Sequence, residues 1–315
     1  MEAKGEFFIS QYLKELLCFV GQQMVFEEAS QTVNKLTHAK VSSKQIERLC
    51  HHYGEKLEQE EEQQIQQGEN GVHYPAKELH YIELDGGMVL TREEKWKEMK
   101  LCRIFSNKDS VKVSKDRKQI TQSNYVGHLG SHKNFLEKVE QHTDFISQKV
   151  FLADGAPWIW NWVESLYPQS IQILDFNHAK DHVCLFAENQ FKDTEQKRQW
   201  IDRQLLRLLN DEVEQVITDI KNTKPATRKA GKTKTALIRY YQHHTKRMKY
   251  KTFREKGLII GSGAIEAAHR HVIQHRMKLS GQRWTLKGAQ QIANLRMAYK
   301  SNQWSKVQEV IKKAA

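Results

Sequence analysis

Phe151-Leu152-Ala153-Asp154-Gly155-Ala156-Pro157-Trp158-Ile159-Trp160 is the stretch from which the fold of this chain can be worked out. An apolar run ends at an aspartate followed by glycine, and Pro157 stands where a helix would begin. The upstream stretch Tyr81-Ile82-Glu83-Leu84-Asp85-Gly86-Gly87 ends in the same way. Short apolar runs bounded by turn residues are typical of buried strands, so we expect two strands that deliver Asp85 and Asp154 to a sheet edge. The alternative is that each Asp-Gly pair only marks a turn.

The rest of the chain supplies further strands and helices around these two. We expect strands at residues 79–84, 96–105, 110–113, 149–153 and 170–176, and helices at 131–147, 158–166 and 178–189. This order, β-β-β-α-β-α-β-α, predicts an α/β fold with a mixed sheet flanked by helices and with acids at the ends of three strands.

Residues 190–256 interrupt that order with a helical insertion. Long polar helices are expected at 200–221 and 235–254, around a basic connection, 222–233, that we expect to be disordered. The chain then returns to the core at residues 258–266, where Ser262 is a candidate N-cap of a helix that carries Glu266 and continues to about residue 278. A last amphipathic helix is expected at 284–300.

The N-terminal region is expected to be helical, with helices at 7–25 and 26–36 and a third, serine-capped helix after Val41. This is the outline of a helix-turn-helix, although most helix pairs with a short turn bind nothing. The expected domains are the helical region 1–70, the catalytic core 71–189, the basic helical insertion 190–256, the final core segment 257–303 and a tail, 304–315.

Charge is concentrated in one block of the chain. The net charge is +12, and residues 221–256 hold thirteen Lys and Arg against a single acid, so the remainder is balanced. A block of one sign favours a polyanionic partner such as nucleic acid, because neutralising phosphates releases condensed counterions. The alternative is a solvated helix face.

Other sequence features bear on the compartment. No run approaches the roughly 20 apolar residues of a membrane-spanning helix, so we expect no membrane partner. The four cysteines lie far apart without a C-x-x-C pair, and the N-terminus does not have the pattern of a signal peptide. We therefore expect a cytoplasmic protein, associated with the nucleoid if DNA is its partner.

Asp85, Asp154 and Glu266 form a carboxylate cluster if the sheet brings them together. Hard oxygen ligands favour Mg²⁺ or Mn²⁺, and two such ions can activate the attacking oxygen and stabilise the leaving oxygen of a phosphodiester displacement. We expect Gly86, Gly87 and Gly155 to leave room for a DNA backbone next to the acids.

Several ordered motifs resemble one family. They are LDGG (84–87), WKEMK (96–100), FLADGAPWIW (151–160), ILDFNHAKDH (173–182) and GSGAIEAAHRHVIQHRMKLSGQRWTLKGAQQIANLR (261–296). Together they cover roughly residues 80–300 and resemble the DDE transposases of bacterial insertion sequences, within the Kra-type group. The resemblance implies an RNase H-like, retroviral-integrase-like core in which Asp85, Asp154 and Glu266 bind two divalent ions.

The same resemblance extends to supporting and DNA-contacting residues. Asp175 and His178 match an Asp-x-x-His signature, for which a structural hydrogen bond is the other interpretation. Arg276, Lys278, Arg283 and Trp284 match an R-x-K…RW pattern whose members could contact phosphates or a flipped base, with core packing as the alternative for Trp284. The other expected DNA contacts belong to the basic block: Lys229, Lys232, Lys234, Arg247 and Lys249.

The implied reaction is metal-dependent cleavage at the ends of an insertion sequence, followed by strand transfer into target DNA. Synapsis of two ends implies a homodimer. The N-terminus looks short for this family, so one alternative is a truncated, non-catalytic DNA-binding protein. Another is a structure-selective, metal-dependent nuclease on the same fold.

Overall fold

The computed structural model of this chain describes residues 9–68, 72–114 and 117–314. Its contacts define two compact units, the first built from Met1–His80, Asp85–Gln148 and Ile265–Ala315, and the second from Tyr81–Leu84 and Lys149–Ala264. Within the described ranges, no helix combines the length and the apolar character needed to cross a membrane.

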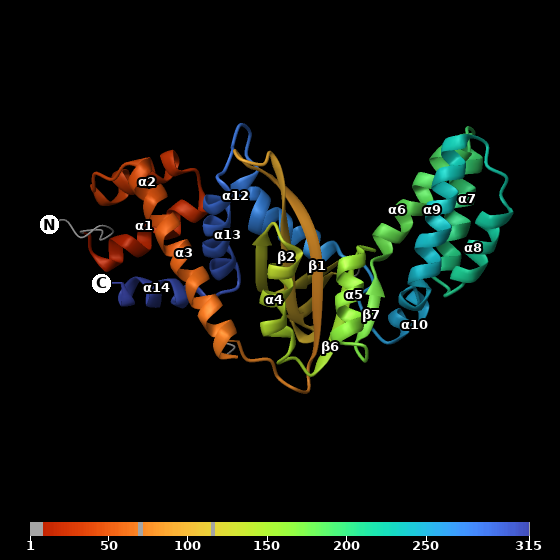
Figure 1. The fold of residues 1–315 in the computed structure, drawn as a ribbon, viewed down its shortest axis with the longest axis horizontal. Coiled ribbons are helices and arrows are strands. Elements are labelled where there is room, and N and C mark those ends of the chain that lie inside the picture. The colour runs from red at the N-terminus through yellow and green to blue at the C-terminus, as the bar shows by residue number, and fades with distance from the viewer. Residues whose placement is uncertain (1–8, 69–71, 115–116, 315) are drawn as a thin grey trace. The chain divides into compact units, whose positions relative to one another are not determined.

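A five-stranded mixed sheet confirms the expected α/β class (Figure 1). Its order is β5-β2-β1-β6-β7, and the strands are β1 (Leu79–Leu90), β2 (Trp96–Ser106), β5 (Asn124–Leu129), β6 (Gln148–Ala153) and β7 (Ile171–Leu174). Strands β2 and β5 are antiparallel, with Met99 opposite Leu129, whereas β6 and β7 are parallel, with Val150 opposite Ile171. The parallel pair brings the residues that follow β6 and β7 to the same edge of the sheet.

The turn expected at Gly86 and Gly87 is wrong, because β1 continues through both glycines to Leu90. A Cβ on Gly86 would lie 2.2 Å from Oε1 of Glu98, and one on Gly87 would lie 2.8 Å from Nδ1 of His269. The glycines therefore make room for neighbouring side chains of the first unit. Asp85 consequently lies inside a strand and not at its end.

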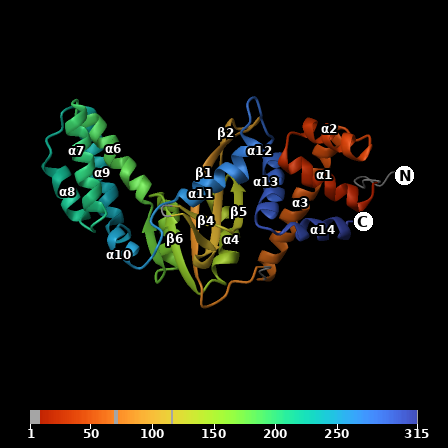
Figure 2. The same ribbon diagram turned by 180° about the vertical axis from the view of Figure 1, so that it is seen from behind.

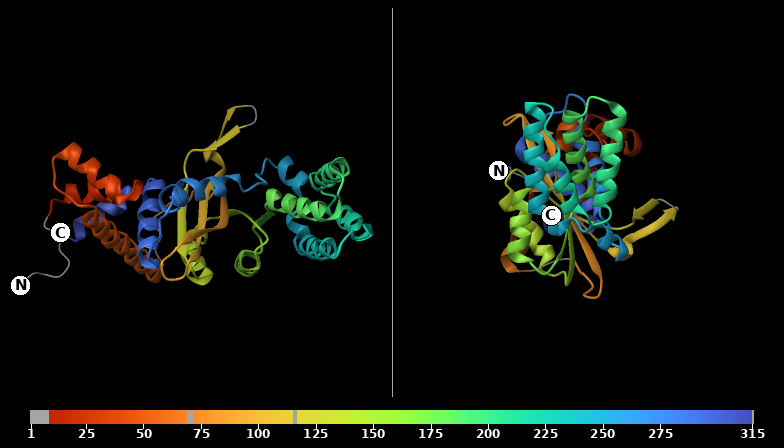
Figure 3. Two further views of the ribbon diagram at one scale, coloured as in Figure 1. Left: turned by 90° about the horizontal axis from the view of Figure 1, so that it is seen from above. Right: turned by 90° about the vertical axis from the view of Figure 1, so that its right-hand side faces the viewer.

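The region between β2 and the next helix holds more strands than expected. After a 3₁₀ turn (Asn107–Asp109), β3 (Ser110–Ser114) and β4 (Arg117–Ile120) form a separate two-stranded ribbon, which projects from the sheet of the first unit (Figure 3). Strand β5 then joins the sheet. We missed β4 and β5 because both are short, and only Val126 and Gly127 of β5 are buried.

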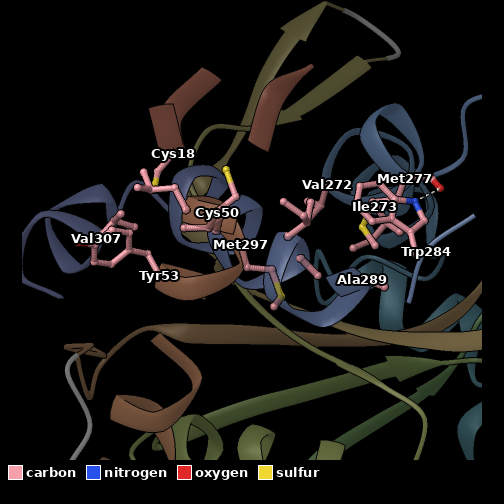
Figure 4. Close-up of a cluster of buried hydrophobic side chains, with 14 of the residues drawn as sticks. Cys18, Cys50, Tyr53, Val272, Ile273, Met277, Trp284, Ala289, Met297 and Val307 are labelled. Atoms are coloured by element: carbon pink, nitrogen blue, oxygen red, sulfur yellow. Dashed lines mark hydrogen bonds between the residues drawn. The ribbon is translucent and has the colours of Figure 1, made fainter. Parts of the chain in front are cut away.

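Helices from both ends of the chain share one core in the first unit. They are α1 (Gln11–Gln23), α2 (Phe26–Thr37), α3 (Ser43–Gln67), α13 (Leu286–Lys300) and α14 (Trp304–Lys313), while α4 (His132–Thr143) packs on β5. Figure 4 shows side chains of this core, including Cys18 from α1, Tyr53 from α3, Met297 from α13 and Val307 from α14.

The three N-terminal helices confirm the expected helical outline. Helix α2 ends at His38, which has a left-handed φ of 57°, and Ser42 caps α3. The Ser42 hydroxyl accepts from the Gln45 amide at 3.3 Å, while the Gln45 side chain accepts from the Ser42 amide at 2.8 Å. This reciprocal capping box fixes the start of the longest helix in the described chain.

The second unit carries α5 (Pro157–Leu166), α6 (Phe176–Gln190), α7 (Thr194–Leu208), α8 (Val213–Asn222), α9 (Arg228–His244) and α10 (Tyr250–Glu255). Helices α6 to α9 lie side by side (Figures 1 and 2). The single helix expected at 200–221 is two helices, separated around Asp211, whose φ is 65°. The helix expected at 235–254 is also interrupted, by a 3₁₀ turn at Thr245–Arg247.

The disorder expected at 222–233 is wrong. Thr227 caps α9 by accepting from the Ala230 amide at 3.0 Å, so the helix begins at Arg228. Lys234 of α9 donates to the carbonyl oxygens of Lys221 and Thr223 at 2.6 and 2.8 Å, which satisfies the end of α8. Only five residues, 223–227, connect the two helices.

The helix expected after Ser262 is present to Met277. It consists of α11 (Gly263–Ala268), a π-helical segment (His269–Gln274) and α12 (His275–Met277). The part from Ile265 onward belongs to the first unit. Figure 2 shows α11 and α12 beside β1 and β2.

Candidate active site

In the first unit, Asp85 lies next to the helix that carries Glu266. Oδ1 of Asp85 accepts from the Gly86 amide at 2.8 Å, and Oδ2 lies 3.8 Å from Nε2 of His269. Glu266 is exposed and lies three residues before His269 in the helical stretch that follows Ser262. Asp85 and Glu266 thus both belong to the first unit, and His269 is the residue of this helix that lies against Asp85.

In the second unit, Asp154 follows β6 directly and lies in the turn that leads into α5. Its Oδ1 accepts from the Ala156 amide at 2.9 Å, and its carbonyl oxygen accepts from Nε1 of Trp160 at 2.6 Å. Both bonds fix the turn in which the acid lies.

The ring of Tyr240, from α9, covers this turn. A Cβ on Gly155 would lie 2.0 Å from Cε2 of Tyr240. Burial first, and then the charges of Asp154 and Asp175, raise the pKa of Tyr240 well above its usual value. The expectation that the glycines leave space for DNA is therefore wrong for Gly155, as for Gly86 and Gly87, because each faces a protein side chain.

Asp175 is a fully buried anchor of the second unit. Its Oδ1 accepts from the amides of Asn177 and Ser262 at 3.1 and 2.8 Å. Its Oδ2 accepts from the His178 amide at 3.1 Å and from the Ser262 hydroxyl at 2.8 Å. Asp175 thus caps α6 and holds the segment that leads into α11, which is the structural hydrogen bonding that the sequence left open.

His178 lies beside this anchor and is partly exposed. Its Nε2 is 3.8 Å from Oδ2 of Asp175, and 42% of its side chain is accessible. Ser262, expected as an N-cap, donates its hydroxyl to Asp175. Asp175 is therefore hydrogen-bonded to the residue that directly precedes α11.

The nine residues expected to contact DNA differ in how far they are exposed. Five are exposed: Lys229, Lys232, Lys249, Lys278 and Arg283. Lys234 is half-buried, and its ammonium group is held by the end of α8.

The remaining three, Arg247, Arg276 and Trp284, are buried and have packing roles. Arg247 pairs with Glu164 and lies over the Trp160 ring, 4.4 Å from its centroid. Arg276 donates to the Gly21 carbonyl at 3.1 Å, and its guanidinium lies 4.9 Å from the Trp284 centroid.

Burial lowers the pKa of Arg276 to about 10. The Trp284 indole donates to the Met277 carbonyl at 3.1 Å, the bond drawn in Figure 4. The structure therefore confirms core packing for Trp284. An Arg or Trp looks the same in sequence whether it packs inside or faces solvent.

A basic groove runs along α9, and of its four cations only Lys232 was among the predicted DNA contacts. It is lined by Lys224, Arg228, Lys232 and Arg239, together with small residues such as Gly231 and Ala236. Arg228, Lys232 and Arg239 recur at i, i+4 and i+11, which places them on one face of the helix. That periodicity was present in the sequence, but it was hidden by the expectation of disorder.

No group of three or more His, Cys, Asp or Glu side chains within residues 9–68, 72–114 and 117–314 is arranged to hold a metal ion. Of the three expected acids, Asp85 and Glu266 belong to the first unit and Asp154 belongs to the second.

Comparison with known proteins identifies the family. Residues 9–313 match UPF0236, described as an uncharacterised protein family, and the chain belongs to it. A search of curated proteins found no match. Because the family description states no activity, the function has to be argued from the residues.

Proposed function

We propose that this member of the UPF0236 family is a DDE transposase, which cleaves the DNA ends of an insertion sequence and joins them to target DNA. The observation that carries the proposal is that Asp85 of β1 lies against the helix of Glu266, on a sheet in which β1 neighbours the strand that leads to Asp154. We further propose that the mixed sheet is an RNase H-like core. The resemblance of the ordered motifs supports this assignment.

The donor chemistry of the three acids fits a hard divalent cation. Asp85, Asp154 and Glu266 offer carboxylate oxygens, the ligands that Mg²⁺ and Mn²⁺ prefer. Asp85 and Asp154 each accept one backbone amide bond, at 2.8 and 2.9 Å, which orients the carboxylate. A carboxylate has about four acceptor positions, so one such bond is compatible with cation binding. Two bound ions would supply activation of the attacking oxygen and stabilisation of the leaving oxygen.

Exposed cations of the second unit supply the proposed DNA contacts. The basic groove of α9 presents Arg228, Lys232 and Arg239 along one helix face, and Lys229 is exposed on the same helix. Such cations bind phosphates without reading sequence. The element ends, the target and a second copy of the chain in a synaptic dimer are the proposed partners, at the nucleoid in the cytoplasm.

The test uses labelled DNA from both flanks of the reading frame, a supercoiled target plasmid, and Mg²⁺ or Mn²⁺. The wild-type chain should yield cleaved ends and joined product. Asp85→Asn, Asp154→Asn and Glu266→Gln should each reduce both products at least about 100-fold, because each removes a charge that would hold the divalent ions. Asp181→Asn, at an exposed acid of α6, is the matched control and should remain active.

Three outcomes contradict the proposal. Cleavage without joined product identifies a nuclease on the same fold. Activity that survives all three substitutions shows that these acids do not carry the chemistry, and DNA binding without any product from the wild-type chain identifies a non-catalytic DNA-binding protein.

A further inference from the structure

We infer that His269 is a positioning residue that holds the carboxylate of Asp85 for cation binding. This inference rests on the proposed function, and it assigns a role to a side chain that the motif resemblance leaves without one. Asp85, Gly87 and His269 all belong to the first unit.

His269 is a buried polar side chain whose ring has no hydrogen bond. Only 3% of the residue is exposed, and neither Nδ1 nor Nε2 has a hydrogen-bond partner among the described residues. An imidazole always carries at least one N–H donor, and leaving a buried donor unsatisfied destabilises the folded protein. An apolar ring would fill this place at lower cost, so packing alone does not explain a histidine here.

The ring is aimed at Asp85. Nε2 lies 3.8 Å from Oδ2 of Asp85, while the Gly86 amide holds the other oxygen, Oδ1, at 2.8 Å. A separation of 3.8 Å is longer than a hydrogen bond, and a side-chain shift of roughly 0.8 Å would close it. The Gly86 amide and the His269 ring would then each donate a hydrogen bond to one oxygen of the carboxylate. Such bonds are usual for carboxylates that bind metal ions.

The backbone near His269 leaves room for its ring next to β1. Gly87 has no side chain, and a Cβ there would lie 2.8 Å from Nδ1 and 3.0 Å from Cε1 of the ring. His269 also begins the π-helical segment, and such segments are frequent at functional sites. By contrast His271, on the same segment, has an ordinary partner, because its Nε2 lies 3.2 Å from the Tyr125 hydroxyl.

The test measures Mn²⁺ binding to the full chain without DNA, by isothermal titration. His269→Phe keeps a ring of similar size and removes both nitrogens. It should leave the thermal midpoint unchanged or higher, yet weaken Mn²⁺ binding about 10- to 100-fold. His269→Gln restores an N–H donor and should recover most of the affinity. His275→Gln, at an exposed position of α12, is the control and should bind as the wild type does.

A second arm asks whether His269 acts through Asp85. In an Asp85→Asn background, adding His269→Phe should cause no further loss of Mn²⁺ affinity. A further loss there, or unchanged affinity in His269→Phe alone while Asp85→Asn binds weakly, would overturn this inference and leave the proposed function standing. If Asp85→Asn itself binds Mn²⁺ normally, the proposed cation role of Asp85 falls, and the inference falls with it.

Discussion

The three glycines beside the acids show how closely the neighbouring side chains approach. Gly86 faces Glu98, Gly87 faces His269 and Gly155 faces Tyr240. Glu98 comes from the next strand along the chain, whereas His269 and Tyr240 come from distant parts of the sequence. The sequence offers the three acids as candidates through its motifs, but the side chains that pack against the neighbouring glycines could not be predicted, since those contacts are tertiary.

Gly155→Ala should destabilise the second unit, because its methyl group would lie 2.0 Å from the Tyr240 ring. Overpacking of this kind costs about 1–3 kcal/mol in the free energy of unfolding. Urea denaturation followed by tryptophan fluorescence measures it. In a Tyr240→Leu background the same substitution should cost less, because the two residues are in contact.

The matched control for that substitution is Gly263→Ala in α11, where no atom lies within 4 Å of the added methyl group. An alanine is favoured over glycine in a helix, so this variant should lose no stability. Equal losses in Gly155→Ala and Gly263→Ala would show that the Tyr240 contact does not limit the site.

At the scale of elements, α9 shows that a segment rich in Lys and Arg can form an ordered helix. Its first half is rich in Lys and Arg, which predicted disorder, but Ala230, Leu237 and Tyr241 are buried at helical spacing, and Tyr241 donates to the Ala179 carbonyl at 2.8 Å. This apolar stripe docks α9 on α6. The helix-forming signal was therefore a sparse periodicity that the charge block obscured.

Strand boundaries failed for a related reason. The apolar run at 149–153 correctly predicted β6, because a fully buried strand reads as a continuous apolar segment. Strand β1 was cut short at Asp85, since paired glycines read as a turn. Local sequence preferences do not indicate that β1 continues through these glycines, because the side chains that pack there, Glu98 and His269, come from other elements.

The basic groove of α9 can be tested as an element. The triple variant Arg228→Gln, Lys232→Gln, Arg239→Gln should weaken binding to duplex DNA and reduce the slope of log K against log salt by about 2.7, because each phosphate contact contributes about 0.9. Fluorescence anisotropy at several salt concentrations measures the slope. These substitutions spare the Thr227 cap and the Lys234 bonds, which deletion of residues 222–233 would destroy.

The control for the groove removes three exposed cations elsewhere in the second unit, Lys192, Arg198 and Arg203. It lowers the net charge by the same amount without touching α9. If both triple variants reduce the slope equally, the effect comes from total charge and the groove is not a binding surface.

At the scale of the whole molecule, the first unit is assembled from three separated segments of the chain. The helices of residues 9–67, the strands of the middle segment and the helices after Ile265 meet in one core, whose members include Leu17, Met99 and Ile292. Helical periodicity predicted several of these helices, but not which of them pack together. Residues 304–315, expected as a tail, hold α14.

Deletion of residues 304–315 should therefore unfold the first unit. Val307, Val310 and Ile311 are buried in its core, and Trp304 donates to Oε1 of Glu15 in α1 at 3.1 Å. Burial of an aliphatic side chain contributes about 1.5–3 kcal/mol, so losing three removes about 4.5–9 kcal/mol, which is comparable to the stability of a whole domain. We expect rapid proteolysis of residues 9–67 and loss of the near-ultraviolet circular dichroism of the unit. Deleting only residues 313–315, which leaves the three buried side chains in place, should preserve both signals, and a protease-resistant chain after the longer deletion would show that the core closes without α14.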